Sequence, residues 1–133
     1  MDCETRISSY RDLKVWDKAM DLVTACYTIT RGFPKEERYG LTSQLQRAAV
    51  SIPANIAEGH ARQHRAEYVQ HLSIARGSLA ELETHVQIAD RLGYLSSDRT
   101  GPILGQCAEV GRMLNGLVRS LRQRQTQPLT PDP

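Results

Sequence analysis

The chain is poor in aromatic side chains and has no long apolar run. Phe, Trp and Tyr make up 5% of its 133 residues, so Leu, Ile, Val and Ala must fill the core. No stretch of about 18 apolar residues occurs that could cross a membrane. The polar N-terminus, "MDCETRISSY", lacks the apolar segment of a secretory signal. We therefore expect a cytoplasmic protein without a membrane partner.

Several frameworks and catalytic motifs are also missing. The cysteines number three, and none has CxxC spacing, which argues against a disulfide scaffold or a zinc site. The sequence contains no GxxxxGK(S/T) phosphate loop, no GxGxxG turn and no GxSxG elbow. Its histidines match neither HExxH nor the Glu-x-x-His pairs of di-iron bundles. We expect no enzyme activity, no catalytic residue, no cofactor and no metal.

What the sequence does have is apolar residues at three- and four-residue steps along four segments, a spacing typical of amphipathic helices. The first is expected over about residues 12–31 and the second over 40–58, with Gly59 as its C-terminal cap. The third follows a heptad seam and ends at Gly93. The fourth has Pro102 in its first turn, although the pattern does not define its first residue. The stripe expected to face the core in the first segment is Leu13, Trp16, Met20, Val23, Tyr27 and Thr30.

Four such segments with short linkers predict an all-α fold, an antiparallel up-down four-helix bundle. We expect an N-terminal arm over residues 1–11, the bundle over 12–122 and a flexible C-terminal tail over 123–133, which is polar and Pro-rich. Cys26 and Cys107 fall on apolar faces and are expected to be small core residues.

Pro53 lies inside the second segment, where a proline removes a backbone hydrogen bond. We expect helix two to be kinked near Pro53, which directs Ile56 toward the core. The carbonyl of Ala49 then loses its partner, and the hydroxyl of Ser51 is the expected replacement. A variant Pro53→Ala that keeps both fold and oligomeric state would contradict this role.

The second and fourth segments carry more small and apolar residues than one core-facing stripe needs. The glycines of the fourth segment, at positions 101, 105, 111 and 116, favour close backbone approach. Either tight packing inside a subunit or a subunit interface would explain these residues, and we favour the interface. The residues expected at the oligomer interface are Val50, Pro53, Ala54 and Ala57.

A polar stripe runs along the second segment beside the apolar one. Its spacing predicts a structural polar network with the third segment, in which Glu58 and Arg76 form a bidentate ion pair between helices. A ligand or nucleic-acid surface is the alternative reading. The expected network residues are Asn55, Glu58, Arg76 and Glu81.

Four stretches of the sequence together resemble a known family. They are "YRDLKVWDKAMDLV" (10–23), "FPKEERYGLTSQLQRAAVSIPANIAEG" (33–59), "LSIARGSLAELETHVQIADRLGYL" (72–95) and "VGRMLNGLVRSLR" (110–122). They look like the bacterial four-helix-bundle proteins encoded in intervening sequences of large-subunit ribosomal RNA genes. The loop "HARQHR" (60–65) and the start of the fourth segment (96–109) depart from the family pattern.

The resemblance implies a non-enzymatic protein related to the accessory variability determinant of diversity-generating retroelements. That relative forms a barrel-like homopentamer, binds nucleic acid through a basic surface and contacts a reverse transcriptase. The resemblance therefore implies that this chain is a homo-oligomer, with five as the leading subunit number. It also implies RNA or DNA and a nucleic-acid-processing protein as partners.

Charge leaves the nucleic-acid reading open. The net charge is only +2, but 14 of the 17 basic residues are Arg, whose planar fork suits phosphate and carboxylate. We expect an oligomeric scaffold or adaptor that binds RNA or DNA. The alternatives are a protein–protein interaction module without nucleic-acid binding and, less favoured, small-molecule or metal binding in the bundle. The expected nucleic-acid-binding residues are Arg31, Lys35, Arg38, Arg47, Arg62, Arg65, Arg119, Arg122 and Arg124.

Overall fold

A computed structural model describes residues 9–126 of the chain, with side chains as far as Gln123. The four helices are α1 (Lys14–Thr30), α2 (Leu41–His60), α3 (Arg65–Arg91) and α4 (Ser97–Thr126), and two short 3-10 turns, η2 (Tyr10–Asp12) and η3 (Lys35–Glu37), precede α1 and α2. No strand occurs in this part of the chain. The predicted all-α class is confirmed.

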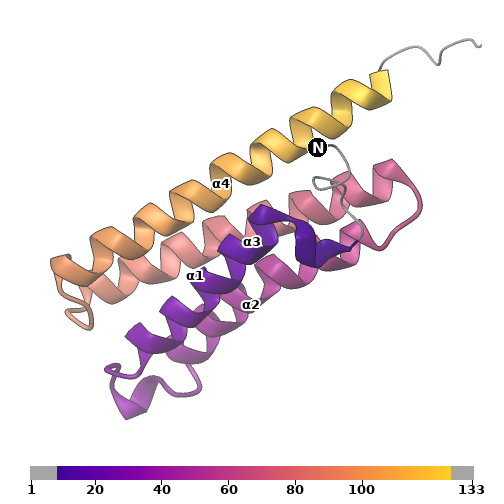
Figure 1. Ribbon diagram of the computed structural model, residues 1–133. Coiled ribbons are helices and arrows are strands. Elements are labelled where there is room, and N and C mark those ends of the chain that lie inside the picture. The colour runs from indigo at the N-terminus through magenta and orange to yellow at the C-terminus, as the bar shows by residue number, and fades with distance from the viewer. Residues whose placement is uncertain (1–8, 127–133) are drawn as a thin grey trace, which may run out of the picture.

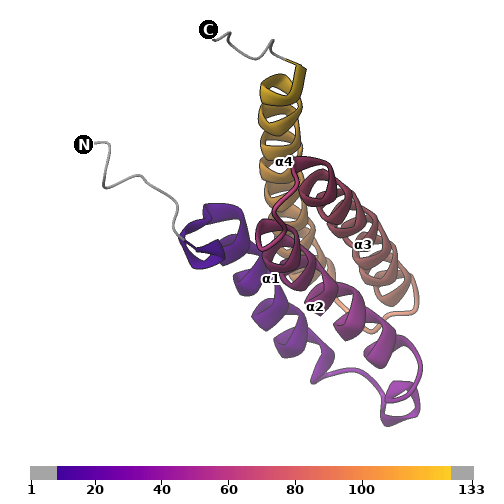
Figure 2. The ribbon, with the colours of Figure 1, turned by 90° about the vertical axis from the view of Figure 1, so that its right-hand side faces the viewer.

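The helices run up and down in sequence order and pack as a four-helix bundle (Figure 1). Each helix contacts the next one along the chain, and α1 also contacts α4. The contact between α2 and α3 is the most extensive and that between α1 and α4 is the smallest of the four. Figures 1 and 2 show the C-terminal part of α4 diverging from the other helices. The antiparallel bundle predicted from the sequence is therefore confirmed.

Two glycines end or join helices in different ways. Gly93 has a φ of 81° and follows α3, where the next amide, that of Tyr94, donates to the carbonyl of Ala89 at 2.9 Å. This left-handed C-terminal cap was predicted. Gly59 was expected to cap α2, but it lies inside the helix, which continues to His60. A Cβ added at Gly59 would lie 2.8 Å from the Cβ of His71, so Gly59 instead lets α2 and α3 approach closely.

The start and end of α4 differ from the expectation. The carbonyl of Ser96 accepts a hydrogen bond from the amide of Thr100 at 3.0 Å, so the helix begins one turn earlier than Pro102 alone implies. Pro102 lies within the helix, beyond its first turn. At the other end α4 continues to Thr126. The predicted N-terminal arm and C-terminal tail fall largely on residues 1–8 and 127–133, which lie outside the described residues.

The core-facing side of α1 is only in part the stripe that the sequence suggested, of which Thr30 is buried. Met20 and Tyr27 are 38% and 42% exposed, and Trp16 and Val23 are only half-buried. A parallel stripe, also at steps of three and four, is buried instead: Val15, Ala19, Leu22, Cys26 and Ile29. Both stripes are apolar and adjacent, so α1 can bury one and leaves the other at the surface.

The expected role of Ser51 beside Pro53 is also wrong. Helix α2 is continuous across Pro53, whose side chain is buried. The hydroxyl of Ser51 lies 2.8 Å from that of Ser78 and accepts from the amide of Asn55 at 3.1 Å, so it does not replace the lost backbone donor. The kink itself stays a prediction.

The glycines of α4 do not show the close packing that was one of the two explanations offered for them. A Cβ added at Gly101, Gly105 or Gly116 would meet nothing within 4 Å. Only at Gly111 would it touch a neighbour, the Leu79 Cδ2 atom at 3.2 Å. Tight packing inside the subunit therefore explains Gly111 and leaves three glycines at open positions.

Candidate functional site

The exposed apolar stripe of α1 lies beside a stripe of small and apolar residues on α2. A hydrogen bond from Gln46 Nε2 to Thr30 Oγ1, at 3.0 Å, joins the two helices. The two helices run antiparallel away from that bond. On each of them apolar or small side chains recur every three or four residues, which places them on one side of the helix. We call this surface the α1–α2 face and define it by Trp16, Met20, Val23, Tyr27, Val50, Ala54 and Ala57.

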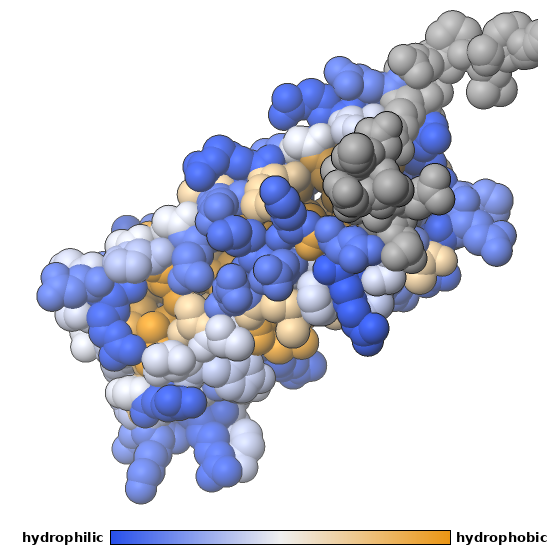
Figure 3. All heavy atoms as spheres, viewed as in Figure 1, coloured by the Kyte–Doolittle hydropathy of each residue, from blue (hydrophilic) through white to orange (hydrophobic). Residues whose placement is uncertain are grey.

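None of the seven residues that define the α1–α2 face is charged. Val50 is 43% exposed, Ala54 is exposed and Ala57 is half-buried, so three of the four residues predicted at an oligomer interface reach this surface. Pro53 does not, because it is buried within the chain. Figure 3 shows apolar side chains at the surface over α1 and α2, between polar side chains.

Two adjoining hollows lie beside the linker that contains η3, where α1 ends and α2 begins. We call them together the tyrosine groove. One has a volume of about 780 Å³ and the other about 590 Å³. They share Arg38, Tyr39 and Thr42, so the Tyr39 side chain borders both. The remaining lining residues are Tyr27, Ser43, Gln46, Arg47, Val50 and Ser51 in the larger hollow and Thr30, Phe33, Pro34 and Lys35 in the smaller.

The tyrosine groove is positively charged. Its lining includes Lys35, Arg38 and Arg47 and no acidic residue. None of the three cations forms an ion pair with a described residue. Tyr39 is 87% exposed, and the Arg38 guanidinium lies 5.6 Å from the centre of its ring. The groove thus combines cations that have no ion-pair partner with an aromatic ring that is largely exposed.

Sequence reasoning predicted the three cations of the groove but missed its tyrosines. Tyr27 was assigned to the core, and Tyr39 was assigned no role. The available signal was the pair Arg38–Tyr39 in the short linker before α2, because an aromatic residue in a polar linker has no apolar stripe to join.

The other predicted nucleic-acid-binding residues do not join this groove. Arg31 ends α1 close to it, whereas Arg62 and Arg65 lie at the opposite end of α2, about 30 Å away by helix length. Arg119 and Arg122 line a hollow of about 330 Å³ between α3 and α4. The side chain of Arg124 lies outside the described residues. We call the second basic site the arginine hollow; its lining is Arg76, Asn115, Val118, Arg119, Arg122 and Gln123.

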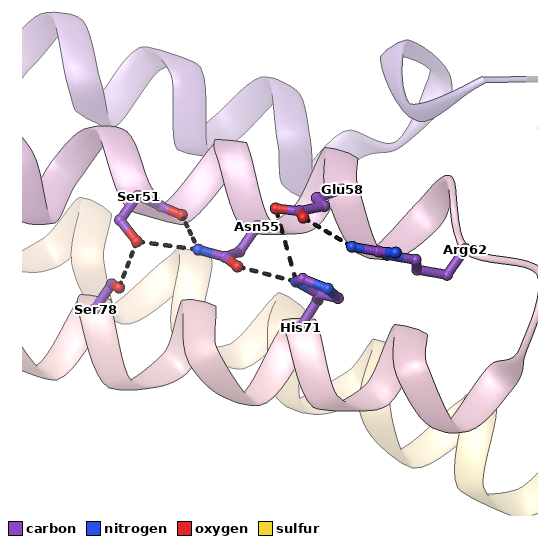
Figure 4. Close-up of polar contacts among 6 residues, drawn as sticks. All are labelled: Ser51, Asn55, Glu58, Arg62, His71 and Ser78. Carbon is purple, nitrogen blue, oxygen red and sulfur yellow. Dashed lines mark hydrogen bonds and ion pairs between the residues drawn. The ribbon is translucent and has the colours of Figure 1, made fainter.

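A polar seam joins α2 to α3 and is drawn in Figure 4. The amide of Asn55 donates to the carbonyl of Ser51 at 2.9 Å, which directs its Oδ1 atom toward Nδ1 of His71 at 3.1 Å. Because this oxygen can only accept, the Nδ1 atom of His71 carries a proton. The same nitrogen lies 4.0 Å from Glu58.

The seam contains two of the four residues predicted for the polar network, Asn55 and Glu58, and the predicted ion pair between Glu58 and Arg76 is not formed. Glu58 pairs with Arg62 on its own helix at 2.9 Å, not with Arg76. The Arg76 guanidinium donates to Asn115 of α4 at 2.9 Å. Glu81 accepts from Nε2 of His85 at 3.3 Å. The four predicted residues therefore belong to three separate contacts. Arg76 lies on the side of α3 that faces α4 and not on the side that faces α2.

His85 carries the one buried side-chain polar atom without a hydrogen-bond partner among the described residues, its Nδ1. Since the carboxylate of Glu81 only accepts, Nε2 carries a proton, and in the neutral form of the ring Nδ1 is then a lone pair. A buried lone pair is less costly than a buried N–H without an acceptor. This explains why the fold tolerates an Nδ1 atom without a partner at His85.

A carboxylate ties the two loops at the tyrosine-groove end together. Glu37 accepts from the amide of Leu41 at 2.9 Å and from the hydroxyl of Tyr94, also at 2.9 Å. The Leu41 amide first, and then the Tyr94 hydroxyl, hold the pKa of Glu37 below its usual range. The same bond raises the pKa of Tyr94. Glu37 therefore fixes the linker that presents Arg38 and Tyr39.

The two described cysteines, Cys26 and Cys107, are both buried. Burial raises the pKa of both Cys26 and Cys107 to about 12, so neither thiol is a nucleophile near neutral pH. Between residues 9 and 126 no group of three or more His, Cys, Asp or Glu side chains is placed to hold a metal ion. None of the described helices is long and apolar enough to span a membrane.

Comparison with known proteins agrees with this architecture. The sequence model of the family described as 23S rRNA-intervening sequence protein matches residues 11–116. A solved structure, described as a protein with unknown function from the S23 ribosomal protein family of Bacteroides thetaiotaomicron VPI-5482, is 24% identical. Its TM-score is 0.74, over 79% of this chain and 95% of that one. At this identity the likeness shows the fold alone. The search of curated proteins found no match.

Proposed function

We propose, from the premise that the chain belongs to the 23S rRNA-intervening sequence protein family, that it is a non-enzymatic adaptor. In this proposal copies of the chain assemble through the α1–α2 face, and the assembly binds RNA or DNA through its basic side chains.

The observation that carries the proposal is the α1–α2 face. An uncharged surface of two adjoining apolar stripes is unusual on a soluble monomer, and such patches mark interaction sites. Small residues such as Ala54 and Ala57 allow a partner helix to come close. The occupant we propose is a second copy of the chain. The resemblance to the retroelement accessory protein makes five the expected number of subunits.

Unpaired cations support the nucleic-acid part of the proposal. The tyrosine groove and the arginine hollow together contain six basic residues without an ion-pair partner among the described residues: Lys35, Arg38, Arg47, Arg76, Arg119 and Arg122. In an assembly each site is repeated once per subunit. Repetition raises the local positive potential although one chain has a net charge of only +2.

The solution mass with and without a mixed pool of RNA and DNA tests both parts. We expect a multiple of the 14.9 kDa chain mass at micromolar concentration, and a further mass increase with the pool that disappears as salt is raised. A species of 14.9 kDa would remove the assembly. A stable assembly that binds no polynucleotide would instead favour the protein–protein interaction module.

A further inference from the structure

We propose that the tyrosine groove binds unpaired nucleotides, with a base stacked against Tyr39 and the flanking phosphates held by Lys35, Arg38 and Arg47. This inference rests on the proposed nucleic-acid binding and deepens it, because it names single strands as the ligand and one groove as their site. Tyr27 and Val50 belong both to the α1–α2 face and to the lining of the larger hollow, so in the proposed assembly the neighbouring copy forms one wall of that hollow.

The exposure of Tyr39 is the first argument. Its ring is 87% exposed although burying an aromatic ring favours folding. Burial against the chain therefore does not explain a tyrosine here. Its position beside two hollows makes it available to a flat ligand. Base–aromatic stacking is the usual way in which proteins hold single strands, because every base has a π-face.

The distribution of charge around the ring is the second argument. The three groove cations have no acidic residue in the groove lining, whereas Arg62 is paired with Glu58 at 2.9 Å and Lys18 with Glu109 at 3.8 Å. Fixed cations beside an aromatic ring match the alternation of phosphate and base along a strand.

The lining also offers hydrogen-bonding groups at the depth of the groove. Gln46 lines the larger hollow and uses its Nε2 atom to reach Thr30, so the Oε1 atom of the same amide is not used in that bond. The hydroxyls of Thr42 and Ser43 line the same space. Volumes of about 780 and 590 Å³ fall within the range of small-ligand sites, so each hollow has room for a nucleotide.

These features select single strands over duplexes. In a duplex the faces of the bases stack on one another and are closed to a protein side chain. Cations alone bind both forms, whereas stacking on Tyr39 requires an unpaired base. The Tyr39 ring therefore predicts that the tyrosine groove prefers single strands to duplexes. The arginine hollow has no aromatic residue in its lining, so no such preference is predicted for it.

Fluorescence anisotropy with labelled strands of about 12 nucleotides tests the inference. The probes are single-stranded RNA, single-stranded DNA and a duplex of the same sequence, and the proteins are the full chain, Tyr39→Ala and Tyr39→Phe. We expect Tyr39→Ala to weaken single-strand binding roughly ten-fold, Tyr39→Phe to bind as the wild type does, and duplex binding to be unaffected. Because Tyr39 is exposed, we expect both variants to fold as the wild type does. Circular dichroism checks this.

The outcomes separate the two proposals. Single strands and duplex bound equally, or Tyr39→Ala bound as tightly as the wild type, would overturn the groove as a stacking site and leave nucleic-acid binding in place. Absence of binding to every probe would overturn both. A difference between the RNA and DNA strands that is lost with Tyr39→Ala supports the site and names its natural ligand.

Discussion

The two broad faces of the bundle differ although each is formed by two antiparallel helices. The α1–α2 face is apolar and uncharged and carries the tyrosine groove at one end. The hollows along α3 and α4 are lined by apolar and small residues together with arginines, Glu83 and Asn115, and the Arg76–Asn115 hydrogen bond crosses between the helices. The second face therefore carries charged side chains among its apolar ones.

This difference indicates where a partner binds. Both faces contain small residues, so smallness alone does not distinguish them. The α1–α2 face pairs small residues with partly exposed Trp, Met, Val and Tyr side chains, which gain free energy when a partner covers them. The same comparison predicts that charge is tolerated on α3–α4 and not on α1–α2.

Ala54→Glu should have the largest effect. Ala54 is exposed, so the subunit still folds, but an unpaired carboxylate buried in an apolar interface costs several kcal/mol. We expect association to weaken roughly thousand-fold, so that sedimentation gives the 14.9 kDa chain mass. The matched control is Ala108→Glu, an exposed position of α4, which should leave the mass unchanged. Equal masses for the two variants would contradict the assignment of the faces.

The two basic sites are compared by paired double variants. Arg38→Ala with Arg47→Ala should lower the slope of log binding constant against log salt by about 1.4 for a single strand. The double variant Arg119→Ala with Arg122→Ala should lower this slope by less than half as much. The reason is that no aromatic ring holds the strand at the arginine hollow. Salt-dependent anisotropy measures both slopes. A larger change at the arginine hollow would reverse the comparison.

Two glycines sharpen the contrast in packing. Gly59→Ala places a Cβ 2.8 Å from that of His71, so α2 and α3 must separate, and we expect a loss of about 1–3 kcal/mol in the free energy of unfolding. Gly105→Ala meets nothing within 4 Å and should add about 0.5–1 kcal/mol by removing helical glycine. Urea unfolding measures both. If Gly105→Ala destabilises the assembly instead, a copy of the chain also covers α4.

Glu37→Gln should have the smallest effect, and one that depends on pH. Because the folded chain holds the pKa of Glu37 below its usual 4.5, the charged carboxylate stabilises the fold above that value. This stability is lost as the pH falls through the lower folded pKa. The difference in unfolding free energy between wild type and Glu37→Gln should therefore be present at pH 7 and vanish in acid. A difference that persists at pH 2 would show that shape rather than charge matters.

The helices could be predicted because their signals are local. Apolar steps of three and four define all four segments, and Gly93 marks the end of α3 as expected. Helix ends that depend on neighbours were missed: Gly59 looks like a cap in sequence and is a contact point in space. The sequence also could not tell which of two equal stripes of α1 is buried, because both have helical spacing and only the position of α2 and α4 decides.

The individual residues of the candidate site could be predicted from the sequence, but their arrangement in space could not. Val50, Ala54 and Ala57 were recognised as surplus apolar surface, and Arg38 and Arg47 as basic residues. Their relation to Tyr27 and Tyr39 depends on how the η3 linker folds against the end of α1, which follows from contacts such as Glu37 with Tyr94, 57 positions apart in the chain. Residue types suggest a chemistry, whereas long-range contacts decide which residues share a surface.

Acrylamide quenching of Trp16 tests most directly whether a second copy covers the α1–α2 face. Trp16 is the only tryptophan of the chain and lies on this face, half-buried and edge-on to Tyr10 at 5.2 Å. At micromolar concentration we expect weak quenching in the wild type and clearly stronger quenching in Ala54→Glu. Equal quenching in the two proteins would contradict self-association through this face.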